Sequence, residues 1–493
     1  MRRLRPTLDQ VWLVAALALV AFRSLLVPIP PHDFWWHLAT GRIIATQGQI
    51  PTVDSFSYTR TGEPFYNQSW LAQLLFYTLH QMGGIPLLLL TQALMLTAAY
   101  ALLLHLSVRQ SGRLRLSAGL LLLGTIPASF DNWMVRPQTY AIPLFISYLA
   151  ILTHWRRTGS PRWILFILPV LGTVWVNLHG SFVLGGLLIL LTFVAECVRR
   201  GVKGMGEQEQ PPLGQLFLVG LLTGAGWLIN PRGWQVLGYV GNLLGSSQVT
   251  QLVTEWAPPT IREPSGAIFF LFVIAAIVIL SYAGRPSDPV DIFLVVVFLW
   301  IALGAGRNTI WFVAVATPLL ARQLVTWRPR VGPVFQGLAL LNAAIIALIM
   351  ILLIAALPWI KPHLGLPPNL GPLIDRETPV AAVEFLRNEV PRPQRLFHAM
   401  SVGSYLIWAA PEQLVWADPR IELYPGTQWR DYQQLSAGRE VERLLATYAI
   451  DGLLLSRREQ GALIGWAAAR PEQWELRYSD ASTSYFRAIG RGD

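Results

Sequence analysis

The residues best suited to chemistry lie in the segment HDFWWHLATG at 32–41, directly after the first apolar segment of the chain. Asp33 and His37 lie four residues apart, so a helix places this carboxylate and this imidazole on one face. Trp35 and Trp36 are suited to anchoring a protein at a membrane surface, whereas an acid beside an imidazole is not. We therefore predict a polar pocket here that holds a substrate, a metal ion or a buried partner.

The composition indicates a protein that crosses a membrane many times. Hydrophobic residues make up 53% of the chain and charged residues 13%, which leaves too little polar surface for a soluble protein of this length. The net charge is +10, but the basic residues form short clusters between apolar segments, as topology signals do, and we expect no nucleic-acid partner. The single cysteine, Cys197, excludes an intramolecular disulfide and a thiolate metal cluster.

Eleven apolar segments approach the length of about 17 to 25 residues that a transmembrane helix needs. These predicted spans lie at 11–27, 85–107, 116–130, 139–154, 163–179, 181–198, 213–229, 267–283, 290–306, 309–325 and 334–357. The amphipathic run from Ser69 to Met82, which ends at Gly83 and Gly84, is too short to span and is interpreted as a helix lying in the membrane interface.

The basic residues predict which side of the membrane each connection faces. Sixteen Arg and Lys residues lie in one set of alternate connections, and only six lie in the other, longer set. Because cytoplasmic connections carry the excess of positive charge, we expect a cytoplasmic N-terminus. The loop at 28–84 and the tail after residue 357 are then exoplasmic.

Two domains are predicted. An α-helical transmembrane domain occupies 1–357 and includes the exoplasmic loop 28–84 with its interfacial helices, and a small exoplasmic α/β domain occupies 358–493. In the second domain, helix and strand patterns alternate. We expect helices at 379–388, 441–448 and 462–469, strands at 395–400, 413–418 and 451–456, and a hairpin through 474–488.

With this topology, nearly all of the unusual polar residues map to the exoplasmic ends of the predicted spans. They are Asp33, His37, Asp54, Asn67 and Gln68 in the first loop, Asp131 and Arg136 after the third span, Asn177 and His179 at the end of the fifth, Glu255 and Trp256 after the seventh, and Arg307 and Asn308 after the ninth. Polar side chains at a bilayer boundary are costly to bury without partners. We therefore predict that they face one another across a shared cavity.

Several short motifs carry a family resemblance that extends over nearly the whole chain. They are HDFWWHLATGRII at 32–44, IPTVDSFSYT at 50–59, NQSWLAQ at 67–73, RPQ at 136–138, WVNLHGSF at 175–182, NPRG at 230–233, EW at 255–256 and DPRIELY at 418–424. With these motifs the chain resembles the GT-C class of integral-membrane glycosyltransferases, and specifically a group from bacteria. The resemblance implies a multi-pass protein of the bacterial inner membrane, and the link to glycosyl transfer is an analogy of fold.

The resemblance implies transfer of a sugar from a polyprenyl-phosphate donor to an acceptor on the exoplasmic face. Asp33 matches the family's first-loop acid, which acts as catalytic base or metal ligand. A carboxylate within hydrogen-bond reach of the acceptor hydroxyl suits inverting transfer, and Arg136 or Arg307 would stabilise the departing phosphate. The residues predicted to bind substrate are Trp36, His37, Asp54, Gln68, Arg136, Asn177, His179, Glu255 and Arg307. The expected partners are the lipid-linked donor and membrane lipids, and the acceptor is unknown.

The sequence departs from the family at one position that bears on metal binding. Relatives often carry a second acid two residues before the matching aspartate, and this chain has Pro31 there. A site with two acids is therefore not expected. A mixed site for a divalent ion, made by His32, Asp33, His37 and Asp54, is the remaining possibility.

Each of these residues also has a purely structural interpretation. Asp33 would cap a helix, and His37 would be a buried histidine with satisfied hydrogen bonds. Asn177 and His179 would hydrogen-bond helix ends, and Arg136 would cap backbone carbonyls. In the C-terminal domain, the interpretation we favour for Asp418, Arg420 and Tyr424 is an internal ion pair that fixes their loop, not a ligand-facing turn.

Two other functions are consistent with the composition. A transporter or flippase would need polar residues near the middle of the spans, but Arg23, His105 and Glu196 all lie toward span ends. A non-catalytic scaffold whose C-terminal domain binds a partner would tolerate loss of Asp33.

Overall fold

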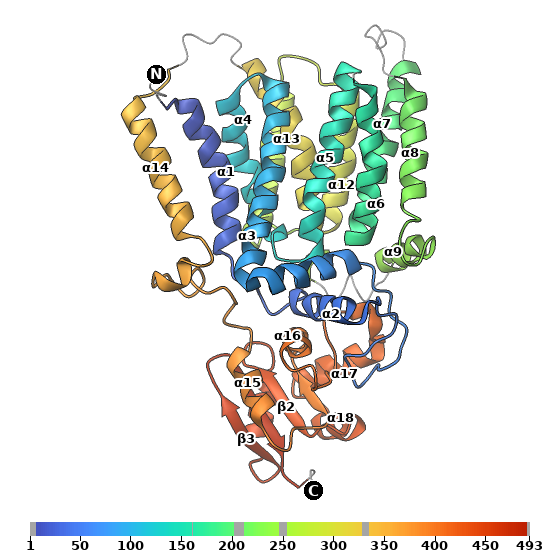
Figure 1. The fold of residues 1–493 in the computed structure, drawn as a ribbon, viewed down its shortest axis with the longest axis vertical. Helices are drawn as coiled ribbons and strands as arrows, with labels where there is room; N and C mark the ends of the chain where they lie inside the picture. The colour runs from blue at the N-terminus through green and yellow to red at the C-terminus, as the bar shows by residue number, and fades with distance from the viewer. Residues whose placement is uncertain (1–5, 160, 202–211, 246–253, 328–334, 491–493) are drawn as a thin grey trace. The chain divides into compact units, whose positions relative to one another are not determined.

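The computed structural model describes residues 6–159, 161–201, 212–245, 254–327 and 335–490. The chain divides into two compact units that are each built from separate parts of the sequence (Figure 1). We call Met1–Val27, Ile85–Gly241 and Val253–Gly365 the helical unit, and Pro28–Gly84, Asn242–Leu252 and Leu366–Asp493 the mixed unit. The predicted boundary at residue 357 stays a prediction, because these units are defined by contacts alone.

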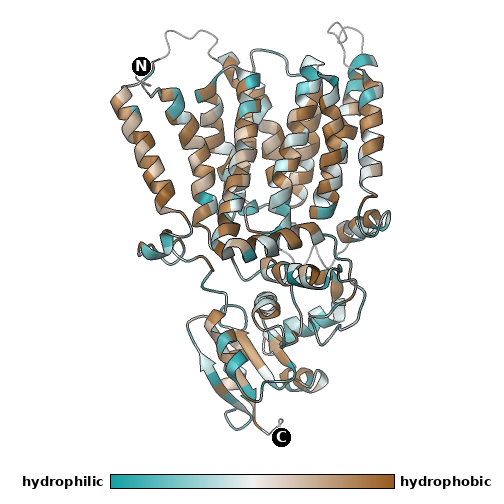
Figure 2. Ribbon diagram, viewed as in Figure 1, coloured by the Kyte–Doolittle hydropathy of each residue, from teal (hydrophilic) through white to brown (hydrophobic). Residues whose placement is uncertain are grey.

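The helical unit consists of helices joined by short connections. Its α-helices are α1 (Leu8–Leu26), the second part of α3 (Trp70–Ser111), α4 (Leu114–Leu120), α5 (Pro137–Thr158), α6 (Ile167–Leu178), α7 (Val183–Gly201), α8 (Leu213–Gly226), α9 (Gln235–Gly245, whose last residues belong to the mixed unit), α11 (Pro264–Ser281), α12 (Pro289–Gly304), α13 (Thr309–Leu324) and α14 (Ala339–Ala355). Apolar residues run along most of their length (Figure 2). Every predicted span coincides with helical structure.

Length and apolar composition alone qualify five stretches, within the part of the chain that the structure describes, to cross a membrane. They are Leu8–Leu26, Trp70–Ser111, Gly180–Gly201, Pro264–Ser281 and Gly306–Trp327. Five of the other predicted spans coincide with shorter apolar helices, and the span predicted at 139–154 coincides with α5, which has 22 residues but is not among the stretches that qualify. The prediction of eleven spans is therefore neither confirmed nor contradicted.

The helix α13 is the most buried element of the helical unit. All of its residues except Arg322 and Leu324 are buried. It packs against α11 and α12, and Trp311 on α13 contacts Phe145 on α5 with ring centroids 4.8 Å apart. A helix that is apolar on all sides is stable only when other helices surround it, as α13 is here.

The predicted break after Met82 is present in the backbone of α3. Gly83 has φ −163° and ψ 19°, and Gly84 has φ 63° and ψ −159°, so neither residue is helical. The second conformation is open essentially only to glycine. Trp70–Met82 is thus a separate helix, as expected from its amphipathic pattern, and its place in the membrane interface remains a prediction.

The mixed unit contains the small α/β fold expected for the C-terminal segment. Its elements are α2 (Phe34–Gln47), the first part of α3, α15 (Val380–Asn388), β1 (Leu396–His398), α16 (Met400–Ala409), α17 (Gly426–Ser436), α18 (Val441–Thr447), β2 (Gly452–Ser456), α19 (Gly461–Ala468), β3 (Trp474–Ser479) and β4 (Thr483–Ala488). The four strands have the order β1-β2-β4-β3, with β1 parallel to β2 and the other pairs antiparallel.

One predicted strand is wrong, and two helices were not predicted. Residues 413–418 form no strand, because their backbone groups pair outside the sheet. Val415 pairs with Phe56 and Tyr58 of the first loop, and the N–H of Trp416 donates to His398. The helices α16 and α17 lie where the sequence analysis placed no element.

Candidate functional site

In the helical unit, Arg136 and Glu255 form a close ion pair. Arg136 is the N-cap residue of α5, and Pro137 fits the first helical position because its missing N–H would have no partner there. Nη1 of Arg136 lies 2.5 and 2.6 Å from the two carboxylate oxygens of Glu255, which belongs to the 3-10 turn Thr254–Trp256. The two side chains are 9% and 27% exposed, so the pair is largely withdrawn from solvent.

Arg307 lies beside this pair and contacts two residues that are close to the pair in the sequence, Gln138 and Trp256. Nη2 of Arg307 donates to Oε1 of Gln138 at 2.5 Å, and the amide of Gln138 donates back to the carbonyl of Arg307 at 3.3 Å. The guanidinium carbon also lies 4.8 Å from the centre of the Trp256 ring, within cation–π range. Gln138 follows Arg136 by two residues, and Trp256 follows Glu255 directly.

Five residues from three separate connections thus meet in one place, and we call them the arginine cluster: Arg136, Gln138, Glu255, Trp256 and Arg307. Guanidinium groups bind phosphate oxygens through paired N–H donors, and an indole ring suits the apolar face of a sugar. The structure brings together Arg136, Glu255 and Arg307 as the sequence analysis expected. Gln138 was not singled out, although the RPQ motif contains it.

Asn177 and His179 form hydrogen bonds at helix ends, as their purely structural interpretation predicted. The amide of Asn177 donates to the carbonyls of Thr173 and Ile229, each at 2.8 Å. Nδ1 of His179 accepts the backbone N–H of Ser181 at 3.1 Å and so caps the short turn that follows. Both side chains stabilise helix ends, and any role in binding substrate remains a prediction.

In the mixed unit, Asp33 stands at the N-terminus of α2 but does not cap it. Its backbone is helical, and no hydrogen bond runs from its side chain to the first turn. The capping interpretation of Asp33 is therefore wrong. His37 is only 6% exposed, stacks on Trp36 with ring centroids 3.7 Å apart, and has Nδ1 3.1 Å from the amide nitrogen of Gln73. These contacts match the interpretation of His37 as a buried, hydrogen-bonded histidine.

The two tryptophans of the first loop are buried within the mixed unit. Trp35 is 1% exposed and donates from its indole to the carbonyl of Pro30, and Trp36 is 8% exposed. The backbone N–H of Trp36 donates to Ser404 on α16. Their burial does not support the interpretation as surface anchors. Gln68 is also buried, and it accepts a long hydrogen bond from Ser69.

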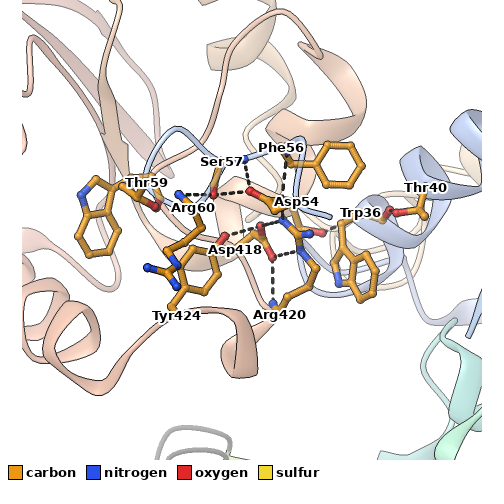
Figure 3. Close-up of polar contacts among 12 residues, drawn as sticks. Trp36, Thr40, Asp54, Phe56, Ser57, Thr59, Arg60, Asp418, Arg420 and Tyr424 are labelled. Atoms are coloured by element: carbon orange, nitrogen blue, oxygen red, sulfur yellow. Dashed lines mark hydrogen bonds and ion pairs between the residues drawn. The ribbon is translucent and has the colours of Figure 1, made fainter. Parts of the chain in front are cut away.

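Asp54 belongs to a buried network that joins the first loop to the C-terminal segment of the same unit (Figure 3). One oxygen of Asp54 accepts the hydroxyl of Ser57 at 2.6 Å, and the other accepts Nη2 of Arg420 at 2.7 Å. Arg420 also donates through Nε to Asp418 at 2.8 Å, and the Tyr424 hydroxyl donates to Asp418 at 2.7 Å. The expected Asp418–Arg420 ion pair is confirmed, whereas its link to Asp54 was not predicted.

Asp418, Arg420 and Tyr424 have fixed protonation states at neutral pH. Burial raises the pKa of Asp418, but Arg420 and the hydrogen bond from Tyr424 outweigh burial and hold that pKa below its usual value. Burial lowers the pKa of Arg420, but the neighbouring carboxylates Asp418 and Asp54 raise it well above the usual value. Burial and the Asp418 carboxylate raise the pKa of Tyr424, so the phenol stays protonated.

The mixed metal site expected at His32, Asp33, His37 and Asp54 is not formed. Within the described residues, no three His, Cys, Asp or Glu side chains gather as ligands of one metal ion would. The physical reason is visible at two of the four positions. Asp54 uses both oxygens within the buried network, and His37 uses Nδ1 on Gln73.

No protein-family model and no curated protein matches the sequence. Solved structures do resemble this one. The oligosaccharyltransferase AglB from Archaeoglobus fulgidus, in complex with an inhibitory peptide and a dolichol-phosphate, matches with TM-score 0.59 and 13% identity over 98% of this chain and 75% of that chain. ArnT from Cupriavidus metallidurans, bound to undecaprenyl phosphate, matches with TM-score 0.55 and 11% identity over 98% of both chains.

The arabinofuranosyltransferase AftD from Mycobacteria matches with TM-score 0.57 and 13% identity, covering 98% of this chain and 42% of the much longer AftD chain. These three neighbours share the GT-C architecture, so the GT-C-like fold expected from the sequence is confirmed. Together with the apolar helices, the fold defines this chain as a multi-pass membrane protein. At 11 to 13% identity, the likeness establishes the fold and leaves the chemistry to be argued from this chain's own residues.

Proposed function

We propose that this protein is a membrane glycosyltransferase that moves a sugar from a polyprenyl-phosphate donor to an acceptor on the exoplasmic face. The observation that carries the proposal is the GT-C-like fold shared with ArnT over 98% of both chains, since that structure is bound to undecaprenyl phosphate. The dolichol-phosphate bound to AglB adds support for a lipid carrier. The arginine cluster supplies the cationic and aromatic groups that such a donor requires.

In the proposed reaction, the carrier phosphate binds Arg136 or Arg307 of the arginine cluster. The Asp33 carboxylate accepts the proton of the acceptor hydroxyl as its oxygen attacks the anomeric carbon of the sugar. The bond between that carbon and the phosphate oxygen breaks, and the carrier phosphate leaves with the electron pair. A guanidinium that meets the departing phosphate stabilises the charge that develops on it.

A metal ion has no part in this proposal. One structure of the Archaeoglobus fulgidus oligosaccharyltransferase, with TM-score 0.57 to this chain, contains zinc and sulfate. The residues expected to hold a metal here are instead engaged with protein partners, as described for Asp54 and His37. We therefore derive no step through a metal ion.

The proposal is tested by Asp33→Asn in membranes, with transfer of sugar from a lipid-linked donor as the readout. Loss of a general base lowers the rate by a factor on the order of 100 to 10,000. Asp375→Asn is the matched control, because Asp375 is a partly exposed aspartate of the same unit whose side chain accepts the backbone N–H of Glu377, two residues further on. Unchanged transfer by the Asp33 variant would remove the proposed base, whereas absence of transfer by the unsubstituted protein would favour a non-catalytic scaffold.

A further inference from the structure

The ion pair between Arg136 and Glu255 occupies the position that an anionic ligand would take on this guanidinium. Both carboxylate oxygens of Glu255 contact one nitrogen, Nη1, at 2.5 and 2.6 Å. Glu255 is three times as exposed as Arg136, at 27% against 9%. Of the two partners, Glu255 is therefore the one that can withdraw into solvent while Arg136 stays in place.

The guanidinium of Arg136 retains a donor that the carboxylate does not use. Its Nε is buried and has no hydrogen-bond partner among the described residues. Arg136 also precedes the first turn of α5, where the helix dipole adds partial positive charge. The N–H groups of a guanidinium form two forks, Nη1 with Nη2 and Nε with Nη2, and a phosphate group, which carries more acceptor oxygens than a carboxylate, can bind a whole fork where Glu255 engages Nη1 alone. Phosphate thus matches this arginine better than Glu255 does.

We infer that Glu255 is an internal substitute for the carrier phosphate, and that donor binding exchanges the Glu255 carboxylate for phosphate on Arg136. This inference rests on the proposed function and adds a specificity determinant to it. A buried guanidinium that loses its counter-ion without replacement is strongly disfavoured. An anionic lipid supplies that replacement and a neutral lipid does not, so Glu255 makes binding selective for a phosphorylated carrier.

The exchange is tested by measuring the affinity of the full-length protein in nanodiscs for undecaprenyl phosphate. Glu255→Gln removes the competing charge and tightens binding about tenfold, equivalent to ~1.4 kcal/mol. Arg136→Gln weakens binding, and the double variant binds like Arg136→Gln because Glu255 acts only through Arg136. Undecaprenol, which lacks the phosphate, shows no gain from Glu255→Gln.

Glu263→Gln is the matched control, since Glu263 is an exposed glutamate at the N-cap position of α11, in the same connection, and its side chain neither caps that helix nor forms an ion pair in the described part of the chain. It leaves the affinity for undecaprenyl phosphate unchanged.

If Arg136→Gln weakens binding but Glu255→Gln fails to strengthen it, the exchange is wrong while the phosphate role of Arg136 stands. If Arg136→Gln has no effect, both the exchange and the phosphate role of Arg136 are wrong, and the proposed function then depends on Arg307 as the phosphate-binding arginine. Glu255→Asp, which keeps the charge on a shorter side chain, gives an intermediate affinity and replaces Glu255→Gln should that variant fold poorly.

Discussion

At the scale of single residues, His398 shows how a buried polar side chain can serve the backbone. Its Nε2 accepts the N–H of Trp416 at 3.0 Å, and its Nδ1 donates to the carbonyl of Ala399 at 2.8 Å. Only the neutral imidazole with its proton on Nδ1 can make both bonds. Burial lowers the pKa of His398 from 6.5 to about 4. This histidine holds β1 and the segment around Trp416 together, and the sequence analysis did not notice it.

The lowered pKa of His398 predicts a loss of stability in mild acid. Between the folded pKa of about 4 and the unfolded value of 6.5, the unfolded chain binds a proton that the folded chain excludes. Stability therefore falls as the pH drops from 6.5 toward 4, by about 3 kcal/mol in total. Thermal unfolding of the full chain between pH 7.5 and 4.5 measures this loss. His398→Gln flattens the pH dependence, whereas His363→Gln, at an exposed histidine, keeps it. An unchanged slope in His398→Gln would contradict the assignment.

At the scale of elements, the Asp54–Arg420 pair ties the first loop to the segment that precedes α17. The two residues are 366 positions apart, and their side chains are 0% and 2% exposed. Three aromatic rings surround the guanidinium, those of Trp36, Phe56 and Phe65. Water therefore cannot replace a missing partner.

Removing one side of this buried pair should be costly. Asp54→Asn leaves Arg420 paired with Asp418 but disrupts the buried hydrogen bonds that the Asp54 carboxylate accepts from Ser57 and Arg420, and we expect a loss of about 1 to 3 kcal/mol in stability. The matched control is Glu377→Gln, which breaks the exposed pair with Arg458, 49% and 75% exposed, and has little effect on stability because solvent screens the pair. Thermal unfolding and limited proteolysis of the first loop measure both effects. Equal stability of the two variants would show that the buried Asp54–Arg420 pair contributes no more to the free energy of unfolding than the exposed pair does.

The elements also show what the sequence could and could not predict. Local patterns identified the helical segments, the break at Gly84 and most strands, because periodicity and glycine act within a few residues. The prediction of a strand at 413–418 was wrong, because the backbone of Val415 in this segment pairs with the first loop and not with the sheet. The residues at span ends were found from topology, and four of them, Arg136, Glu255, Trp256 and Arg307, meet in the arginine cluster. The role of Asp54 was missed because a partner 366 positions away leaves no local signal.

At the scale of the whole molecule, the fold tolerates almost complete replacement of its side chains. This chain and ArnT share 11% identity while their structures match over 98% of both. What the two sequences must share is the succession of apolar segments and the breaks between them, which lipid requires of any helical membrane protein. The few polar residues at the ends of those segments are not required by the fold, so they can differ from one protein to another and determine substrate specificity.

The orientation of the whole chain decides whether the proposed reaction is exoplasmic. Basic residues such as Arg109, Arg113 and Arg115 should remain in the cytoplasm, where the positive-inside rule places them. An alkaline phosphatase reporter should therefore be inactive when fused in 109–115 and active when fused in the loop 28–84 or after residue 357. A fluorescent protein, which reports cytoplasmic fusions, should give the opposite pattern and serves as the control. If only the reporter after residue 357 changes side, one span was miscounted and the first loop keeps its assignment. A phosphatase that is inactive in the loop 28–84 would place Asp33 in the cytoplasm and rule out its action on an exoplasmic acceptor.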